Sequence, residues 1–144
     1  MQYETIFSLA NGLALVSWLY LAIFTFRPAT SKILIGVSIS LLCLTYSILV
    51  FQVLKPGSFS QFNSLEGITS LLSVPGAALV GWVHYLAFDL MVGVWISLNA
   101  AKYGIRQITL LPCFLGTFML GPAGLLLYLL VRWAVSRQYF ADNN

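Results

Sequence analysis

Apolar residues gather into four long segments that short polar connections separate. Each segment is close to the ~20 residues that a helix needs to cross ~30 Å of hydrocarbon. We therefore predict four membrane-spanning helices, at about residues 6–26, 33–54, 77–100 and 108–131. The pattern predicts an all-α fold, a multi-pass four-transmembrane-helix bundle that forms a single membrane domain over residues 1–144.

The three connections between these segments differ in character. Residues 27–32 are short and polar, so the first two helices should form an antiparallel hairpin. Residues 55–75 carry spaced apolar side chains among polar ones, a pattern typical of a short interfacial amphipathic helix, although an ordered loop fits it equally well. With four spans, the first and third connections carry Arg27, Lys32, Lys102 and Arg106, whereas the opposite side carries Lys55, Arg132 and Arg137. This small excess favours a cytoplasmic location for the first and third connections.

Composition narrows the class of protein further. The chain is 60% hydrophobic and 8% charged, with a mean hydropathy of +0.92, which indicates an integral membrane protein. The net charge of +3 comes from scattered residues, so no basic cluster suggests nucleic-acid binding. Neither cysteine lies in a metal-binding or redox motif, and we predict no metal site.

The third segment contains His84, the only histidine of the chain, and Asp89 within an apolar run. Ionisable groups at membrane depth are costly, so they usually mark function or pairing. At about 100° per residue the two side chains lie about 140° apart, so they should not touch but would border one groove. The opposite, aliphatic sector should face lipid; it consists of Val83, Leu86, Ala87, Leu90 and Val94.

Small and polar residues align along the other segments as well, and we predict that these faces point inward. Pro122 should kink the fourth helix and leave the Phe118 carbonyl without its amide partner. Antiparallel spans would bring Asn11, His84, Tyr85 and Tyr128 to similar depth, with Arg132 above and Asp89 near the midplane, around one polar pocket. The aligned sets are Asn11, Ala14, Trp18 and Ala22; Gly36, Ser40, Cys43 and Ser47; and Thr117, Gly121, Gly124, Tyr128 and Arg132.

Each feature also has a purely structural interpretation. Small-residue faces are usually packing surfaces, and tryptophans are often interfacial anchors. Arg132 more often extends toward lipid headgroups than pairs inside a bundle. Asp89 could be held by a structural hydrogen bond, yet a carboxyl near the midplane favours a ligand-facing role.

Two blocks of residues carry a family resemblance. The stretch 81–96, with His84 and Asp89 separated by four residues, and the stretch 110–132, with Gly121-Pro122-Ala123-Gly124-Leu-Leu-Leu-Tyr128, resemble the abscisic-acid-deficient-4-like family of small membrane proteins. The resemblance implies a four-span fold and a role in forming neoxanthin from violaxanthin. No transit peptide is expected, which suits a bacterial inner membrane or a cyanobacterial plasma or thylakoid membrane.

The implied reaction opens an epoxide to an allenic alcohol, which is redox-neutral and needs an acid and a base but no cofactor. Hydrocarbon favours the protonated form of a carboxyl, so Asp89 would be the acid and His84 the base. Tyr85 and Tyr128 would orient the ring oxygen of an apolar isoprenoid or carotenoid ligand. The other residues expected around the ligand are Asn11, Trp82, Asn99, Thr117, Gly121, Gly124 and Arg132.

Two other classes of function remain open. A midplane carboxyl in a small membrane protein also suits a proton-coupled transporter, which with four spans would need a homo-oligomer to form a path. The chain could alternatively be a non-catalytic scaffold or pigment-binding factor in contact with membrane lipid. A proton-dependent flux and a bound pigment are the observations that separate these classes.

Overall fold

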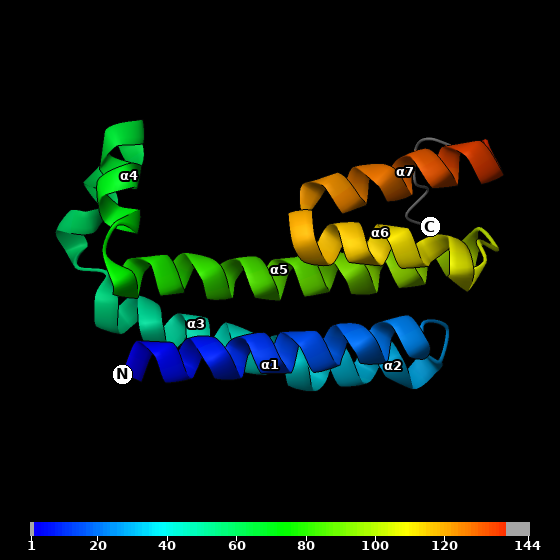
Figure 1. The fold of residues 1–144 in the computed structure, drawn as a ribbon, viewed down its shortest axis with the longest axis horizontal. Coiled ribbons are helices and arrows are strands. Elements are labelled where there is room, and N and C mark those ends of the chain that lie inside the picture. Colours follow the sequence, from blue (N-terminus) through cyan, green and yellow to red (C-terminus); the bar gives the residue numbers. More distant parts are fainter. Residues whose placement is uncertain (1, 138–144) are drawn as a thin grey trace.

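The computed structural model describes residues 2–137, and all the regular elements in that range are helices. Three helical stretches are long and apolar enough to cross a membrane: Gln2–Ile23, Pro28–Val53 and Pro75–Lys102. They lie side by side, and two shorter apolar helices pack over one half of the third (Figure 1). The all-α prediction is therefore confirmed, whereas the fourth predicted span is not a single helix.

The first two long stretches form the predicted antiparallel hairpin. Helix α1 covers Gln2–Ile23, and the second stretch joins α2 (Pro28–Ile33), a π-helix η1 (Leu34–Ile39) and α3 (Ser40–Val53). Pro28 starts α2 at a position where a missing amide costs nothing. The Ser17 hydroxyl donates to Ser38 Oγ across the hairpin at 2.8 Å, which fixes the two helices near the π-helix.

The inward face predicted for the second span is wrong. Gly36, Ser40, Cys43 and Ser47 are all exposed, and Ser38 and Leu42 face the core instead. The π-helix explains part of this result, because each of its turns holds an extra residue and shifts the phase of the helix. The Ser40 hydroxyl accordingly donates to the Ile35 carbonyl five residues earlier.

The long second connection contains a 3₁₀ helix η2 (Pro56–Asn63) and a short helix α4 (Leu65–Leu72). Ser64 begins α4, because its hydroxyl accepts a hydrogen bond from the Gly67 amide at 3.1 Å. In Figure 1, α4 stands across the end of the long helices. The predicted helix is present, and its location in the membrane interface stays a prediction.

Helix α5 (Pro75–Lys102) is the centre of the fold, with α1 and α3 on one side and α6 on the other. The lipid-facing sector predicted for it is wrong, because Val83 and Leu90 are fully buried and Leu86, Ala87 and Val94 nearly so. This sector packs in the core that α1, α3 and α5 share. The exposed side chains of α5 are instead large, as Phe88 and Leu98 illustrate.

The fourth predicted span is a helical hairpin. Helix α6 (Gln107–Leu120) ends at Gly121, and α7 (Pro122–Ser136) runs back beside it (Figure 1). At 1.5 Å per residue each is about 22 Å long, less than the ~30 Å of hydrocarbon. The predicted kink is therefore a reversal, and α7 ends at the same end of the molecule as α5 and not beside the N-terminus.

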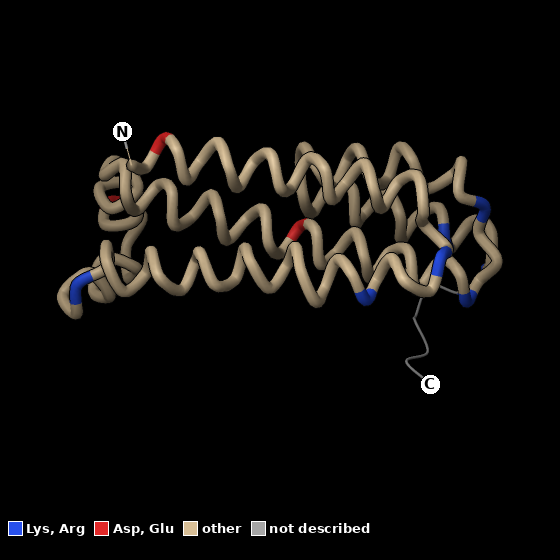
Figure 2. Tube along the Cα trace, turned by 90° about the horizontal axis from the view of Figure 1, so that it is seen from below, with Lys and Arg blue, Asp and Glu red and all other residues tan. Residues whose placement is uncertain are grey.

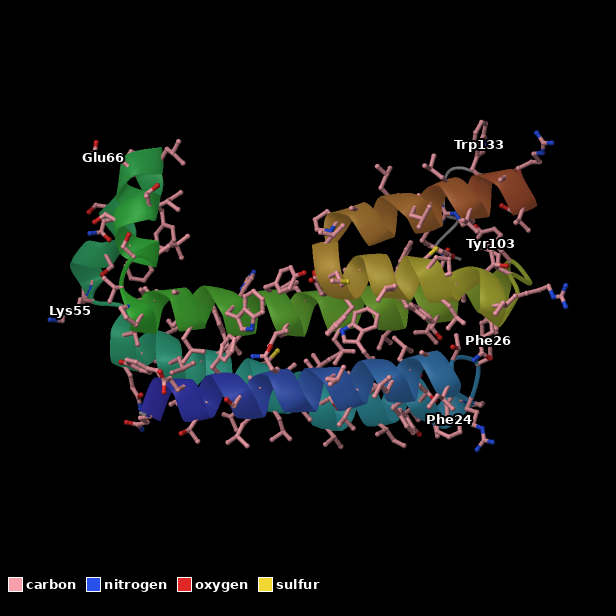
Figure 3. The ribbon with its side chains drawn as sticks, viewed as in Figure 1. Phe24, Phe26, Lys55, Glu66, Tyr103 and Trp133 are labelled. Atoms are coloured by element: carbon pink, nitrogen blue, oxygen red, sulfur yellow. The ribbon has the colours of Figure 1, made fainter. Side chains whose placement is uncertain are left out.

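The reversal changes the distribution of charge. All Lys and Arg residues except Lys55 lie toward the end where α5 and α7 finish, and Glu4 and Glu66 lie toward the other (Figure 2). In Figure 3, Lys55 and Glu66 lie at one end of the molecule, and Tyr103 and Trp133 lie at the other. The charge difference across a membrane would therefore be much larger than a four-span arrangement gives.

Candidate functional site

The turn between α6 and α7 lies against Asp89, halfway along α5. Gly121 has φ 51° and ψ −102°, a conformation that side chains rarely adopt. A Cβ atom at Gly121 would lie 2.9 Å from Asp89 Oδ1 and 3.2 Å from Oδ2. The turn therefore needs glycine both for its backbone and for the close approach of the carboxyl group.

Close packing of small residues holds the hairpin in this position. A Cβ atom at Gly116 would lie 3.1 Å from the Gly124 Cα, and one at Gly124 would overlap the Thr117 backbone and hydroxyl. Thr117 is fully buried, and its hydroxyl donates to the Cys113 carbonyl at 2.8 Å. Thr117 and Gly124 let α6 and α7 approach each other, and their predicted contact with a ligand stays a prediction.

Tyr85 connects the hairpin turn to α5. Its hydroxyl donates to the Phe118 carbonyl at 3.3 Å, the carbonyl that Pro122 leaves without an amide partner. Tyr85 is also a close neighbour of the Asp89 carboxyl. Because the tyrosine proton points to Phe118, the tyrosine oxygen can accept a hydrogen bond from a protonated Asp89.

One oxygen of the Asp89 carboxyl lacks a partner. Asp89 is 9% exposed, and its Oδ2 atom makes no hydrogen bond within residues 2–137. Asp89 lies 14 residues from the start of α5, about 21 Å along a helix of about 42 Å, which places it at mid-depth. A buried polar atom in this state usually meets a ligand or water in the working protein.

A line of aromatic side chains runs along the crevice between α1, α5 and α6, past Tyr85. The Phe7 and Trp82 rings lie 5.8 Å apart, and Trp82 stacks on Tyr85 at 5.4 Å. Beyond the Phe118 carbonyl, the Phe118 ring lies 5.9 Å from the Trp18 ring. The aromatic path therefore consists of two groups of rings that the hydrogen bond between Tyr85 and Phe118 joins, and Asp89 lies close to Tyr85 at this junction.

An apolar cavity lies at each end of this path. The first, of about 310 Å³, is lined by Phe7 and Trp82 and is near the start of α5. The second, of about 200 Å³, is lined by Trp18, Phe114 and Phe118 and lies between α1 and α6. The two cavities and the aromatic path between them form what we call the aromatic crevice. Asp89 is close to the path but is covered by the hairpin turn.

Asn11 and Trp82, two of the residues predicted around the ligand, lie at the first half of the crevice. The Trp82 indole N–H donates to Asn11 Oδ1 at 3.1 Å. The Asn11 amide in turn donates to the Phe7 carbonyl at 2.8 Å. These bonds hold the Trp82 ring in its stacked position on Tyr85.

His84 lies apart from Asp89. Its ring stacks on Phe88 at 4.6 Å and lies 5.4 Å from the Tyr46 ring of α3. Its side chain is exposed and lines a cavity beneath α4, away from the hairpin turn. The structure therefore brings Tyr85, Asp89 and Gly121 together, but it does not bring His84 to them in one pocket.

Tyr128 and Arg132 belong to a second polar cluster in the other half of the molecule. Asn99 Oδ1 accepts hydrogen bonds from the Tyr128 hydroxyl at 2.6 Å and from Arg132 Nη1 at 3.0 Å. The Arg132 guanidinium also lies 5.4 Å from the Tyr103 ring. Arg132 is 2% exposed, so it does not extend to the headgroups as its sequence position suggested.

The predicted single polar pocket is therefore wrong in two respects, of which the separate position of His84 is the first and the position of α7 the second. It placed Tyr128 and Arg132 in the half that holds Asn11, but the reversal at Gly121 carries them to the far half with Asn99. The sequence analysis also missed Phe114 and Phe118, whose aromatic rings line the crevice from α6. Their spacing of four residues on one helix face was the available signal.

Within residues 2–137, no group of three His, Cys, Asp or Glu side chains could hold a metal ion.

A protein-family model described as ABA DEFICIENT 4-like matches residues 5–128. This match confirms the resemblance that the two sequence blocks predicted. No curated protein and no solved structure matches the chain.

Proposed function

The chain belongs to the ABA DEFICIENT 4-like family, and we propose that it binds and isomerises an apolar isoprenoid of the carotenoid class at Asp89. Family membership supports a role in neoxanthin-related carotenoid chemistry. The observation that carries the proposal is the Asp89 carboxyl, buried at mid-depth with one unpartnered oxygen beside the aromatic crevice.

The crevice suits a long, rigid, apolar molecule. Its two cavities lie at opposite ends of the path that Trp82 and Tyr85 form, and both are lined mostly by aromatic and aliphatic side chains. A polyene would stack on the aromatic rings along one half of the path, with one end group in a cavity and the other at the middle of the path. Such a ligand would carry its reacting end to the hairpin turn, where Asp89 lies.

One carboxyl group can supply both proton transfers of an epoxide opening. The proton of a neutral Asp89 passes to the epoxide oxygen, directly or through the Tyr85 hydroxyl, as the C–O bond breaks. The unpartnered Oδ2 takes the proton that leaves the neighbouring polyene carbon, and that C–H electron pair forms the new double bond. The carboxyl ends with its proton on the other oxygen, so the reaction needs no net oxidant or reductant.

This assignment differs from the acid and base pair that the sequence suggested. His84 lies on the α3 side of α5 and contacts Tyr46 and Phe88, so it is distant from the proposed reaction centre. Tyr85 replaces it as the partner of Asp89. The proposed chemistry therefore depends on Asp89 and Tyr85, and His84 has another role.

The test is expression of the chain in a host that accumulates violaxanthin, with the xanthophylls separated by chromatography. We expect a new allenic product with the unmodified chain and none with Asp89→Asn, which keeps the shape of the side chain and loses its acidity. Glu66→Gln is the matched control, because it neutralises a carboxyl in the α4 region and should leave the product unchanged. Full product with Asp89→Asn would overturn the proposal. A pigment that copurifies without any product would indicate a carrier.

A further inference from the structure

His84 belongs to a cavity that the proposed reaction does not use. This cavity of about 240 Å³ lies between α3, α4 and α5, on the side of α5 away from the hairpin turn. Its lining is aliphatic and aromatic except for His84 and the Tyr46 hydroxyl. The lining residues from α4 and η2 are Phe62, Leu71 and Leu72.

The imidazole of His84 is the unusual feature of this cavity. Its ring is fixed between Tyr46 and Phe88 by stacking contacts. Across the described part of the chain, neither of its nitrogens makes a hydrogen bond, although many other side chains at that depth do. A polar group in hydrocarbon without a partner costs up to several kcal/mol, so a ligand that supplies one would bind favourably.

The size of the cavity limits what it can hold. At about 240 Å³ it is smaller than the ~300–1,000 Å³ of pockets that enclose a whole small ligand. It has room for one end group of a larger molecule, whose remainder would lie in the bilayer. Because no Lys, Arg, Asp or Glu lines the cavity, that end group is uncharged.

We propose that the cavity beneath α4 is a second binding site, which holds an apolar end group with a hydroxyl that hydrogen-bonds to His84. The occupant is a membrane amphiphile such as a ring-bearing isoprenoid alcohol. A straight-chain lipid alcohol has the same hydrogen-bonding chemistry but lacks the ring, and the experiment below distinguishes the two. Helix α4 covers the site, so its movement would admit the ligand from the bilayer.

Because His84 is the only histidine, isotope-labelled histidine gives one imidazole signal in the NMR spectrum of the protein in lipid nanodiscs. The probe is β-ionol, a ring-bearing alcohol, compared with the same hydrocarbon without its hydroxyl and with decan-1-ol. We expect a saturable shift of the His84 signal with β-ionol, at least tenfold weaker binding of the hydrocarbon, and weaker binding of decan-1-ol. Equal responses to β-ionol and the hydrocarbon would overturn the hydrogen bond, and tighter binding of decan-1-ol would assign the site to lipid.

Gly81 allows the cavity to be closed while His84 is kept. A Cβ atom there would lie 3.6 Å from Leu72 Cδ2, an ordinary contact, so Gly81→Leu should extend into the cavity without disturbing α5. We expect Gly81→Leu and Leu72→Trp each to abolish the β-ionol shift. Gly12→Leu, which meets nothing within 4 Å, is the matched control. A shift retained in both blocking variants would show that His84 senses the bilayer and would overturn the site.

Asp89→Asn separates this proposal from the proposed function. The carboxyl lies at the hairpin turn and not in the cavity lining, so its replacement should leave the β-ionol response unchanged. Loss of xanthophyll conversion with a normal His84 response would support this second site independently of the reaction. Normal conversion in a protein that shows no His84 response would overturn the second site and leave the proposed reaction unaffected.

Discussion

Gly121→Ala should destabilise the protein through two separate effects. The first is the backbone, since a residue with a side chain at φ 51° and ψ −102° costs about 1–3 kcal/mol. The second is the contact of the new Cβ with Asp89 Oδ1 at 2.9 Å, a distance that forces either the carboxyl or the turn to move. We expect a total loss of about 3 kcal/mol, which is a change of about 100-fold in the unfolding equilibrium.

Gly104→Ala is the matched control for the first effect. Gly104 also has a positive φ, of 63°, but a Cβ atom there would meet nothing within 4 Å. This substitution should cost about 1 kcal/mol, the backbone strain alone. The free energy of unfolding, measured by circular dichroism in mixed micelles as denaturing detergent is added, gives both values.

A double-mutant cycle isolates the contact between Gly121 and Asp89. With Asp89→Ala as the background the carboxyl is absent, so Gly121→Ala should cost only its backbone strain, about 1–3 kcal/mol. A coupling energy near 1 kcal/mol or more would support the close approach. If Gly121→Ala costs the same in both backgrounds, the carboxyl does not lie against the turn, and the geometry proposed for the reaction centre is refuted.

Two further predictions concern topology and the second polar cluster. The first is tested in a chain whose two cysteines are replaced by serine. Membrane-impermeant thiol reagents should label Glu66→Cys from one side of the membrane and Arg137→Cys from the other. Labelling of both from the same side would show that the chain has four spans. Asn99→Leu should cost about 2 kcal/mol in thermal or detergent unfolding, because it removes the buried oxygen that accepts from the Tyr128 hydroxyl and from Arg132 Nη1, whereas the exposed Leu98→Ala should cost little. An equal loss in these two variants would contradict the role of Asn99.

The sequence predicted the three long helices, since length and hydropathy are enough to place helices in a membrane. It failed at Gly121-Pro122, which was interpreted as a kink. Glycine is the residue that most often ends a helix, and proline is favoured at the first position of the next. That pair is therefore a signal for two helices, and the close contacts of Gly116 and Gly124 then allow the second to return along the first.

The sequence could not decide which face of α5 meets lipid. The aliphatic sector around Val83 and Leu90 was correctly recognised as one face, but its direction was wrong. Lipid tails and a protein core are equally apolar, so an aliphatic stripe suits either environment. The buried pair Ser17 and Ser38 marks the inward side of the first two helices more reliably, because a polar group there needs a protein partner.

The position of the charges follows from the hairpin and supports one orientation. Because α7 returns, Arg132 and Arg137 join Arg27, Lys32, Lys102 and Arg106 at one end and leave Lys55 alone at the other. The positive-inside rule then favours a cytoplasmic location for the end that carries the C-terminus, in contrast to the small bias of a four-span arrangement.

The position of the hairpin turn at membrane depth bears on the role of Asp89. Irregular backbone at membrane depth is tolerated only where protein or a cavity covers it, and Asp89 and Tyr85 cover the turn at Gly121. Tyr85 satisfies the Phe118 carbonyl, so that structural requirement is already met without the carboxyl. No side-chain hydrogen bond caps α7, although Asp89 lies against Gly121, the residue before its first. A residue kept only to stabilise the turn would have used its oxygens in that way, so the unpartnered Oδ2 is better explained by a ligand than by the fold.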